Sequence, residues 1–275
     1  MKGKAIYKPS GKAGEYSEWA CNLHTGCSND CAYCYCKRGV LSHVWSNRPR
    51  LKKCFKNEDD AIGSFIRELE ANLSDLLLKG LFFSFTTDPL IKENRHLYAE
   101  CFIICMRYGV PVSILTKDAD FVTDRDFFMN LGISDDEKIS NWLTFGFTLT
   151  GHDELEPYAS TNEQRIEAMK KLHRRGYRTF ASIEPVLDAR SSMDMINRTR
   201  GFCDLYKIGL KSGSGYSDAE LAAIEMMVED LKHYKDITIY LKDSLVNKLG
   251  IDRCTLPPHF VSRHYQILTK PKRHD

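Results

Sequence analysis

Segments with strand-like composition alternate with segments of helical periodicity along most of the chain, and this alternation constrains the fold more than any other feature. Seven apolar runs have the composition of strands: 18–23, 80–86, 110–116, 142–150, 177–187, 202–210 and 237–243. Helical periodicity predicts helices over 60–80, 95–108, 123–131, 161–175, 189–200, 217–233 and 243–249. Short connections between them predict parallel strands with right-handed crossovers, and therefore either a doubly wound sheet or a full or partial (β/α) barrel.

Two of the predicted helices carry clear boundary signals. The helix over 60–80 has apolar residues at three- and four-residue intervals, and Gly80 fits its end. The helix over 161–175 is expected to begin at Ser160 as N-cap, because Glu163 follows at the capping-box spacing, and to end at Gly176.

Polar residues gather where the predicted strands end. In both candidate architectures, chemistry collects at the carboxyl ends of parallel strands. Five polar clusters fall at such ends: the cysteine-rich loop after the first strand, 86–89, 116–117, 148–152 and 184–185. We therefore expect all five to meet on one rim of the sheet.

Composition indicates a globular protein, with 43% hydrophobic and 28% charged residues. The chain has no repeat, low-complexity stretch or linker, so we expect one domain over 1–275, with a core over about 18–243 and a C-terminal extension over about 244–275. The net charge of +2 argues for no partner, but 48–56, 170–178 and 270–274 are locally basic and could contact a phosphate backbone.

The cysteines are the most informative residue type in this chain. No apolar run reaches the roughly 20 residues of a membrane span, and no secretory signal is present, so we expect a cytoplasmic protein in which thiols stay reduced. Clustered cysteines then indicate metal binding or redox chemistry. The six scattered cysteines are expected to fill core space: Cys21, Cys54, Cys101, Cys105, Cys203 and Cys254.

Cys27, Cys31 and Cys34 have the spacing CxxxCxxC. A structural zinc site would need a fourth ligand, for which Cys36 or His24 would have to serve, and the spacing fits such a site poorly. An iron–sulfur cluster held by three thiolates leaves one iron without a protein ligand and open to a substrate.

The cysteine motif, with an aromatic residue before its last cysteine, resembles that of the radical S-adenosylmethionine (SAM) superfamily. Together with FTTDPLIKEN and ILTKDADFVTDRDFF, the stretch NLHTGCSNDCAYCYC resembles the branch of spore photoproduct lyase and the DNA photolyase-like radical SAM proteins, over about 18–210. The resemblance implies a partial (β/α)6-type barrel in which Cys27, Cys31 and Cys34 hold a 4Fe-4S cluster. It also implies that SAM chelates the open iron and is cleaved after reduction to a 5'-deoxyadenosyl radical, which abstracts hydrogen from a substrate.

The same resemblance suggests cofactor-binding roles for residues of the other motifs. Tyr33 would lie against the adenine, although packing within the loop is the alternative. Thr86, Thr87 and Asp88 would accept hydrogen bonds from the SAM ammonium group, unless they form only a turn. Lys117 would pair with the SAM carboxylate, unless it is a solvated lysine.

The fourth and fifth strands supply further candidates. Thr148 would reach the ribose or the carboxylate of SAM. Glu184 is an ionisable group in an apolar run, so it would contact SAM or substrate or form a structural salt bridge. Arg165 and Glu156 follow the fourth strand and are weaker candidates.

The chain departs from the lyase pattern at one position. Spore photoproduct lyases carry a hydrogen-donating cysteine two positions before the Ser of a Thr-Ser-Asp, and Phe85 stands there in this chain. Either Cys36, Cys203, Tyr33 or Tyr35 donates the hydrogen, or the reaction is a different one. We expect a different reaction and do not predict dimer splitting.

Three functions are consistent with these patterns. The first is a radical SAM enzyme acting on a nucleic acid or nucleotide, with an electron donor such as flavodoxin or ferredoxin. The second keeps this chemistry for a peptide or small molecule. The third is a zinc-stabilised binding module without catalysis.

Overall fold

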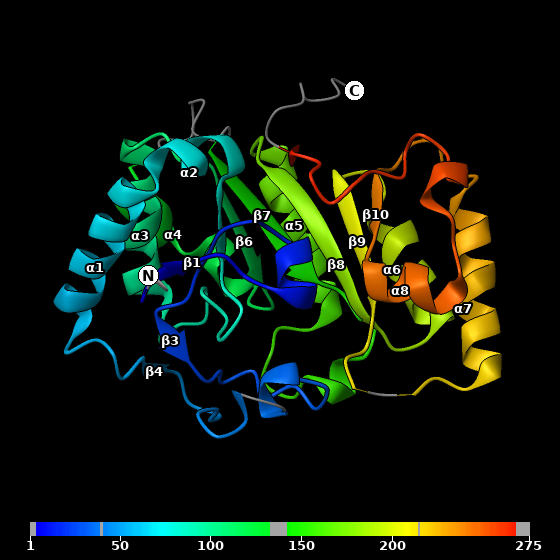
Figure 1. The fold of residues 1–275 in the computed structure, drawn as a ribbon, viewed down its shortest axis with the longest axis horizontal. Coiled ribbons are helices and arrows are strands. Elements are labelled where there is room, and N and C mark those ends of the chain that lie inside the picture. Colours follow the sequence, from blue (N-terminus) through cyan, green and yellow to red (C-terminus); the bar gives the residue numbers. More distant parts are fainter. Residues whose placement is uncertain (1–3, 39–40, 133–141, 214, 268–275) are drawn as a thin grey trace.

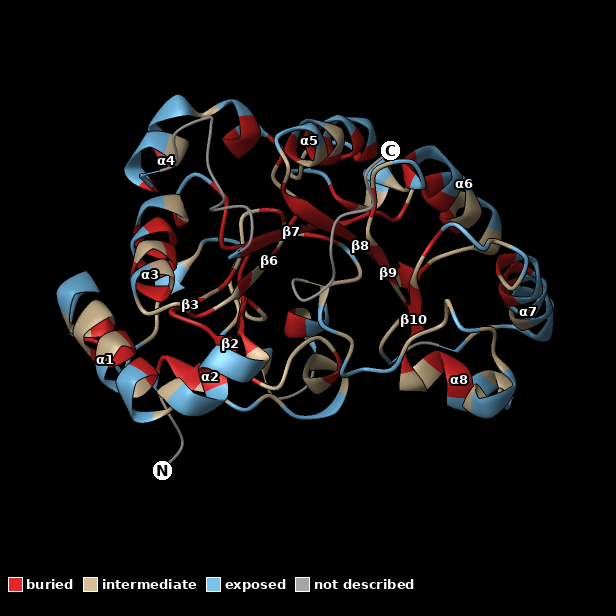
Figure 2. Cartoon of the chain, turned by 90° about the horizontal axis from the view of Figure 1, so that it is seen from above, coloured by how far each residue is buried: buried red, intermediate tan, exposed pale blue. Residues whose placement is uncertain are grey.

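A computed structural model describes residues 4–38, 41–132, 142–213 and 215–267 of the chain. It contains a strongly curved sheet whose outer face is covered by helices (Figures 1 and 2). The strands of this sheet are β1 (Ile6–Tyr7), β2 (Ala20–Cys21), β5 (Leu81–Phe83), β6 (Val112–Thr116), β7 (Leu143–Thr148), β8 (Arg178–Val186), β9 (Leu205–Leu210) and β10 (Ile239–Leu241). A separate pair is formed by β3 (His24–Thr25) and β4 (Arg50–Leu51).

The order of the strands is that of a partial barrel, β1-β2-β5-β6-β7-β8-β9-β10. All neighbours from β2 to β10 are parallel, and only β1 is antiparallel to its neighbour, β2. The seven predicted strands are therefore confirmed, as is the α/β fold of parallel strands. The sheet has one parallel strand more than a (β/α)6 barrel, because β10 pairs with β9.

The helices lie in the predicted places, with one break. They are α1 (Glu58–Ala71), α2 (Leu73–Lys79), α3 (Arg95–Arg107), α4 (Arg125–Asn130), α5 (Asn162–Arg174), α6 (Ala189–Thr199), α7 (Asp218–Leu231) and α8 (Asp243–Leu249). The single helix expected over 60–80 is divided at Asn72, whose side-chain amide donates to the carbonyl of Glu68 at 2.7 Å. Asparagine competes in this way with the backbone pairing of a helix.

The start of α5 corrects the prediction made from the sequence. Thr161, not Ser160, is the N-cap, and Gln164, not Glu163, completes the capping box. The Ser160 hydroxyl instead accepts a hydrogen bond from the backbone amide of Ala119 at 2.9 Å. Two overlapping capping signals one residue apart look alike in sequence, and the tertiary contact with Ala119 separates them.

Side chains of the strands alternate between two faces, and each face has its own packing partners. Phe83 points outward and packs edge-on against Phe102 of α3, with ring centroids 5.0 Å apart. Phe82 points into the barrel, where it forms a cluster with Phe180 and Tyr240. The C-terminal residues Val261, Tyr265 and Ile267 pack against this inner cluster, so the extension after β10 fills part of the barrel interior.

The N-terminal segment spans the open side of the partial barrel, which the sequence patterns did not indicate. Its strand β1 pairs with β2 at one edge of the sheet. Its 3-10 helix η1 (Gly11–Glu15) reaches the other edge, where Glu15 accepts a hydrogen bond from Tyr240 of β10 at 3.0 Å. The following residue, Tyr16, packs against Phe82 inside the barrel, with ring centroids 5.4 Å apart.

Two expectations about cysteines fail. Cys54 and Cys254 are exposed, whereas Cys21, Cys101, Cys105 and Cys203 are buried as predicted. No helix in the described part of the chain is both long and apolar enough to cross a membrane.

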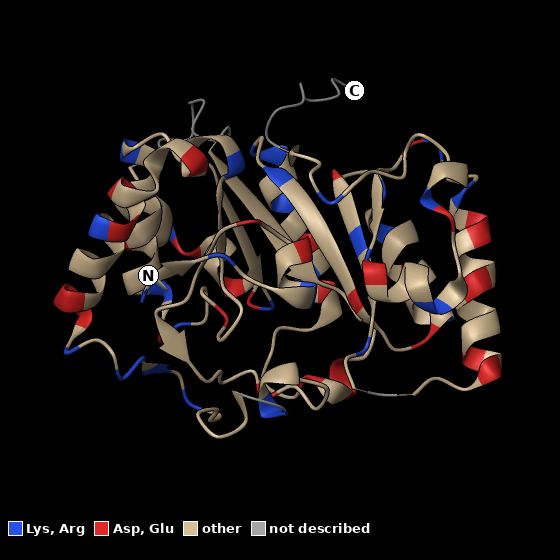
Figure 3. Ribbon diagram, viewed as in Figure 1, with Lys and Arg blue, Asp and Glu red and all other residues tan. Residues whose placement is uncertain are grey.

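Two of the three basic runs lie at opposite ends of the barrel, one near the carboxyl ends of the strands and one at their amino ends (Figure 3). The run 48–56 contains β4, which pairs with β3 directly before the cysteine loop. The run 170–178 covers the end of α5 and the first residue of β8. It therefore lies at the amino ends of the strands, whereas the cysteine loop lies at their carboxyl ends. The run 270–274 lies outside the described residues.

Candidate active site

The cysteine loop and the polar clusters at the strand ends surround one cavity of about 420 Å³. Its lining includes Cys27, Cys31 and Cys34 from the loop after β3. It also includes the predicted residues Tyr33, Thr86, Thr87, Asp88, Lys117, Thr148 and Glu184. The structure therefore brings all ten residues to one place, as expected from the rule on the ends of parallel strands.

A glycine sets the start of the cysteine loop. Gly26 has φ of +87°, and a Cβ atom there would lie 2.5 Å from the carbonyl oxygen of Arg48. The next residue, Cys27, donates its backbone amide to the carbonyl of Ser46 at 3.0 Å. Only glycine therefore allows the loop to turn tightly against the segment before β4.

The three thiols differ in their electrostatic surroundings. Burial raises the pKa of Cys27 to about 12 and also raises the pKa of Cys31. A hydrogen bond from Cys36 lowers the pKa of Cys34 to about 6. A bound cation would favour the thiolate form of all three, since metal binding deprotonates cysteine ligands.

The thiols fit a cluster better than a single ion. Within the described ranges, no three His, Cys, Asp or Glu side chains are close enough to hold one metal ion. Thiolates around one tetrahedral zinc would lie about 4 Å apart, given Zn–S bonds of about 2.3 Å. In a 4Fe-4S cluster each thiolate binds a different iron, so three thiols spread around a cavity are the suitable donor set.

Asp88 connects the cysteine loop to two strands. Its carboxylate accepts from the Asn29 side chain at 2.9 Å, from the Thr116 hydroxyl and the Lys117 amide at 2.7 Å each, and from the Leu90 amide at 3.0 Å. Four donors occupy this buried carboxylate. Asp88 therefore positions the loop and the end of β6, and its contact with the SAM ammonium group stays a prediction.

The neighbouring threonines also have partners within the protein. The Thr86 hydroxyl donates to the carbonyl of His24 at 2.6 Å, and the Thr87 hydroxyl accepts from the Asn94 amide at 2.8 Å. The first contact fixes the loop after β5 against β3, and the second fixes it against the start of α3. A direct role of either side chain in binding SAM stays a prediction.

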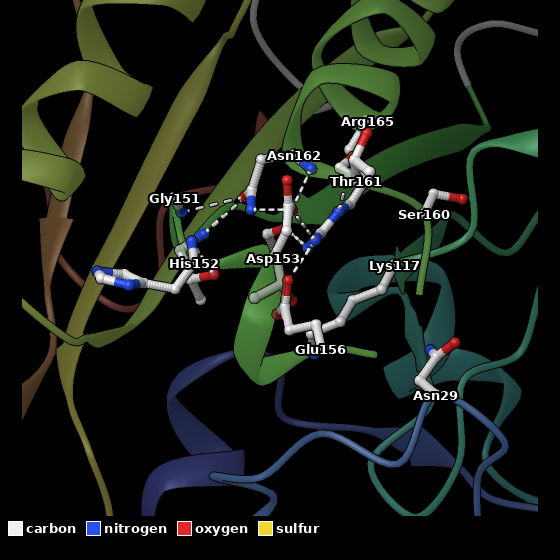
Figure 4. A network of polar contacts seen from close by, with 12 residues as sticks. Asn29, Lys117, Gly151, His152, Asp153, Glu156, Ser160, Thr161, Asn162 and Arg165 are labelled. Carbon is white, nitrogen blue, oxygen red and sulfur yellow. Dashed lines mark hydrogen bonds and ion pairs between the residues drawn. The ribbon is translucent and has the colours of Figure 1, made fainter. Parts of the chain in front are cut away.

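Arg165 and Glu156 form a buried ion pair (Figure 4), and Glu156 also binds Tyr33 of the cysteine loop. Arg165 of α5 is fully buried and pairs with Glu156, whose other carboxylate oxygen accepts from the Tyr33 hydroxyl. Arg165 also donates to the carbonyl of Thr148 at 2.5 Å. The backbone amide of Ala32 donates to Leu155 at 2.9 Å, so the loop after β7 clamps the cysteine loop at two points.

Lys117 supplies a cation next to the cysteines. Its ammonium group lies 5.5 Å from the centre of the Tyr33 ring and, within the described part of the chain, forms no hydrogen bond or ion pair. Burial alone would lower the pKa of Lys117, but its electrostatic interactions with Cys31, when that thiol is ionised, and with Glu156 outweigh this effect and raise the pKa. The lysine therefore stays protonated and free to bind an anionic group.

Glu184 is anchored at the opposite side of the cavity. Its carboxylate accepts from the Tyr16 hydroxyl at 2.8 Å and pairs with the Lys242 ammonium group at 2.7 Å. A Cβ atom at Gly209 would lie 2.9 Å from Glu184 and 2.8 Å from Lys242, so this glycine leaves room for the pair. The structural salt bridge considered for Glu184 is thus present.

Two of the candidate hydrogen donors, Cys36 and Tyr35, line the cavity, whereas Cys203 does not. Cys36 and Tyr35 line the cavity and both donate to the backbone carbonyl of Phe85, the Cys36 thiol at 3.4 Å. Cys203 is buried just before the amino end of β9 and is absent from the cavity lining. Its distance along the strand from the rim excludes it as a donor to a substrate in this cavity.

Sequence reasoning missed several residues of the cavity. Lys242 ends β10 and could have been found by the rule used for the other strand ends. Tyr16, Lys12 and Asn29 lie in segments without periodicity, so no local signal indicated them.

Comparisons with known proteins agree with this architecture. No family model matches the sequence. An uncharacterised protein of Methanocaldococcus jannaschii is 26% identical in an alignment of 220 positions that covers 75% of this chain and 74% of that protein.

Two solved structures are informative about the fold. Spore photoproduct lyase complexed with dinucleoside spore photoproduct has a TM-score of 0.61 at 15% identity, covering 82% of this chain and 77% of that chain. SuiB of Streptococcus suis bound to S-adenosylmethionine has a TM-score of 0.51 at 11% identity, covering 80% of this chain and 50% of that chain. Both are radical SAM enzymes, and this chain shares their fold. The resemblance to the spore photoproduct lyase branch is thereby confirmed at the level of fold.

Proposed function

We propose that this chain is a radical SAM enzyme in which Cys27, Cys31 and Cys34 hold a 4Fe-4S cluster. The observation that carries the proposal is that the three thiols line the same cavity as Lys117, whose ammonium group forms no ion pair with any residue of the described ranges. When bound, the cluster and SAM would supply reductive cleavage of the sulfonium and a radical able to abstract hydrogen.

The residues of the chain would bind, orient and shield these groups. Lys117 would pair with the SAM carboxylate, and Tyr33 would lie against the adenine. Thr86, Thr87 and Thr148 are retained as candidate hydrogen-bonding groups for SAM. Asp88, which lines the cavity, and Glu156 would hold the cysteine loop in place, since their carboxylates already bind protein donors.

A nucleic acid or nucleotide is the substrate class that we favour. The basic run 48–56 flanks the cysteine loop, and the similar lyase structure contains a dinucleoside photoproduct. SuiB bound to its precursor peptide SuiA has the same fold, with a TM-score of 0.55, so a peptide is the alternative substrate. Phe85 in place of the lyase cysteine favours a reaction other than dimer splitting.

A cytoplasmic setting would keep the thiols reduced, and a small donor such as flavodoxin or ferredoxin would supply the electron. Protein reconstituted with iron and sulfide without oxygen should bind about four irons and form 5'-deoxyadenosine from SAM after reduction. Cys31→Ala should lose this product, while Cys254→Ala, which changes an exposed cysteine, should keep it. Undiminished SAM cleavage by Cys31→Ala would refute the proposal.

A further inference from the structure

The cavity is rich in lysine at the end formed by β9 and β10. These strands lie at the opposite side of the sheet from β2, after which the cysteine loop begins. Lys211 and Lys242 follow β9 and β10, while the cysteine loop follows β2 and β3 on the other side of the sheet. Lys12 reaches this end from the N-terminal segment, where its ammonium group donates to the carbonyl of Leu210 at 2.9 Å. The ammonium group of Lys242 in turn donates to the carbonyl of Lys12 at 3.0 Å, and Lys211 directly follows Leu210 in the chain and lines the same cavity.

The acidic residues that line the cavity do not neutralise this end. Asp30 pairs with Lys37 at 2.6 Å. Asp88 is occupied by the four donors described above, near the cysteines. Glu184 pairs with Lys242 at 2.7 Å, so the third carboxylate of the lining is also taken.

Lys12 and Lys211 consequently form no direct salt bridge with any residue that the structure describes. Glu15 and Glu184 act on Lys12, and Glu220 on Lys211, only through longer-range electrostatic interactions. Lys12 has only the neutral carbonyl of Leu210, and the Lys211 ammonium group forms no hydrogen bond or ion pair to any residue that the structure describes. Both are half-buried, and the hydroxyl-bearing residues Ser10 and Ser212 line the cavity beside them. Two excess positive charges with neighbouring hydroxyl groups form a site for an anion.

The type of side chain indicates the type of anion. No arginine lines the described cavity, so an anion at this end would meet the compact charge of lysine and not the planar, bidentate donor that arginine offers to carboxylates and phosphates alike. Lysine acts as a compact point charge and is a common phosphate ligand. A phosphate offers several acceptor oxygens, enough for two ammonium groups and two hydroxyl groups together.

We propose that Lys12 and Lys211 bind a phosphate group of the substrate, and that the substrate is therefore a nucleotide or oligonucleotide. This inference rests on the proposed function, because it uses the same cavity and assigns its remaining part to the substrate. It gives the N-terminal segment a role, since this segment brings Lys12 to the end of β9.

The test measures binding by calorimetry at low ionic strength, with the full-length protein before and after cluster reconstitution. The probes are thymidine 5'-monophosphate, thymidine, inorganic phosphate as competitor, and a tetraglutamate peptide. We expect the monophosphate to bind more tightly than thymidine, and inorganic phosphate to compete with it.

The double variant Lys12→Gln/Lys211→Gln should bind the monophosphate about tenfold more weakly or worse, since two cation–phosphate contacts are lost. Lys235→Gln, which changes an exposed lysine between α7 and β10 outside the basic runs, should bind it as wild type does. Lys211→Arg keeps the charge and should retain binding, and circular dichroism establishes that each variant is folded.

Two results would overturn the inference: equal affinity of wild type and a folded double variant, or equally tight, lysine-dependent binding of tetraglutamate. Because SAM is not needed for binding, the two proposals fail separately. Normal phosphate binding without SAM cleavage would reject the radical enzyme alone, and SAM cleavage without phosphate binding would reject the subsite alone.

Discussion

The ion pair between Arg165 and Glu156 gives the sharpest test of how the cysteine loop is held. Glu156→Gln removes the charge that faces Arg165 and weakens the acceptor for the Tyr33 hydroxyl. Both side chains of the pair are fully buried, with 0% of their area exposed. Removing one partner of such a pair costs about 3–5 kcal/mol, because the other charge stays buried without compensation.

The remaining contacts of Arg165 reduce this cost only in part. The carbonyl of Thr148 at 2.5 Å still accepts from the guanidinium group, but Asp153 lies 3.7 Å away and is half-exposed. We therefore expect the lower part of the range, about 3 kcal/mol. At about 2–4 °C per kcal/mol, the melting temperature should fall by about 6–12 °C.

The assay combines calorimetric melting with amide hydrogen exchange of protein without cluster. Exchange should accelerate in the cysteine loop, where the amide of Ala32 loses its fixed partner Leu155, and reconstituted protein should retain less iron. The matched control is Glu163→Gln, which removes the exposed partner of Arg198 and should cost no more than about 1 kcal/mol. An unchanged melting temperature and unchanged exchange in Glu156→Gln would refute this account of the loop.

Three further predictions follow from single contacts. His152 bonds to Asp188 at 2.5 Å; burial opposes protonation, but bonds to Asp188 and Glu154 raise its pKa overall. The charged His152 should therefore stabilise the folded protein fully below about pH 6.5, and this contribution should be lost as the pH rises through the pKa of the folded state. His152→Gln should consequently lower the melting temperature more at pH 6 than at pH 9. Asp88→Asn places an amide among four donors and should lower both the melting temperature and the iron retained; wild-type values for both would contradict its connecting role. Gly209→Ala should cost about 1–3 kcal/mol in chemical denaturation by crowding the Glu184–Lys242 pair. Gly201→Ala meets no atom within 4 Å and is the control, so equal costs would contradict the crowding.

Much of the fold could be predicted because its signals are local. Apolar residues at helical intervals and nearly continuous apolar strands are read within a dozen residues, and parallel connectivity follows from their alternation. The same rule placed the polar clusters at one rim, and the three cysteines share a single short loop. These features depend on neighbours in sequence, so the sequence alone determined the architecture and the location of the cavity.

The roles of individual side chains were decided by the tertiary structure. Tyr33 meets Glu156 from 123 positions away, and Tyr240 meets Glu15 from 225 positions away. Asp88 binds four protein donors, among them Asn29 from 59 positions away. The N-terminal segment, which has no periodic pattern, closes the barrel and brings Lys12 to the cavity. Such contacts leave no trace in local composition, because the partner of a buried charge is set by the folding of distant segments against one another.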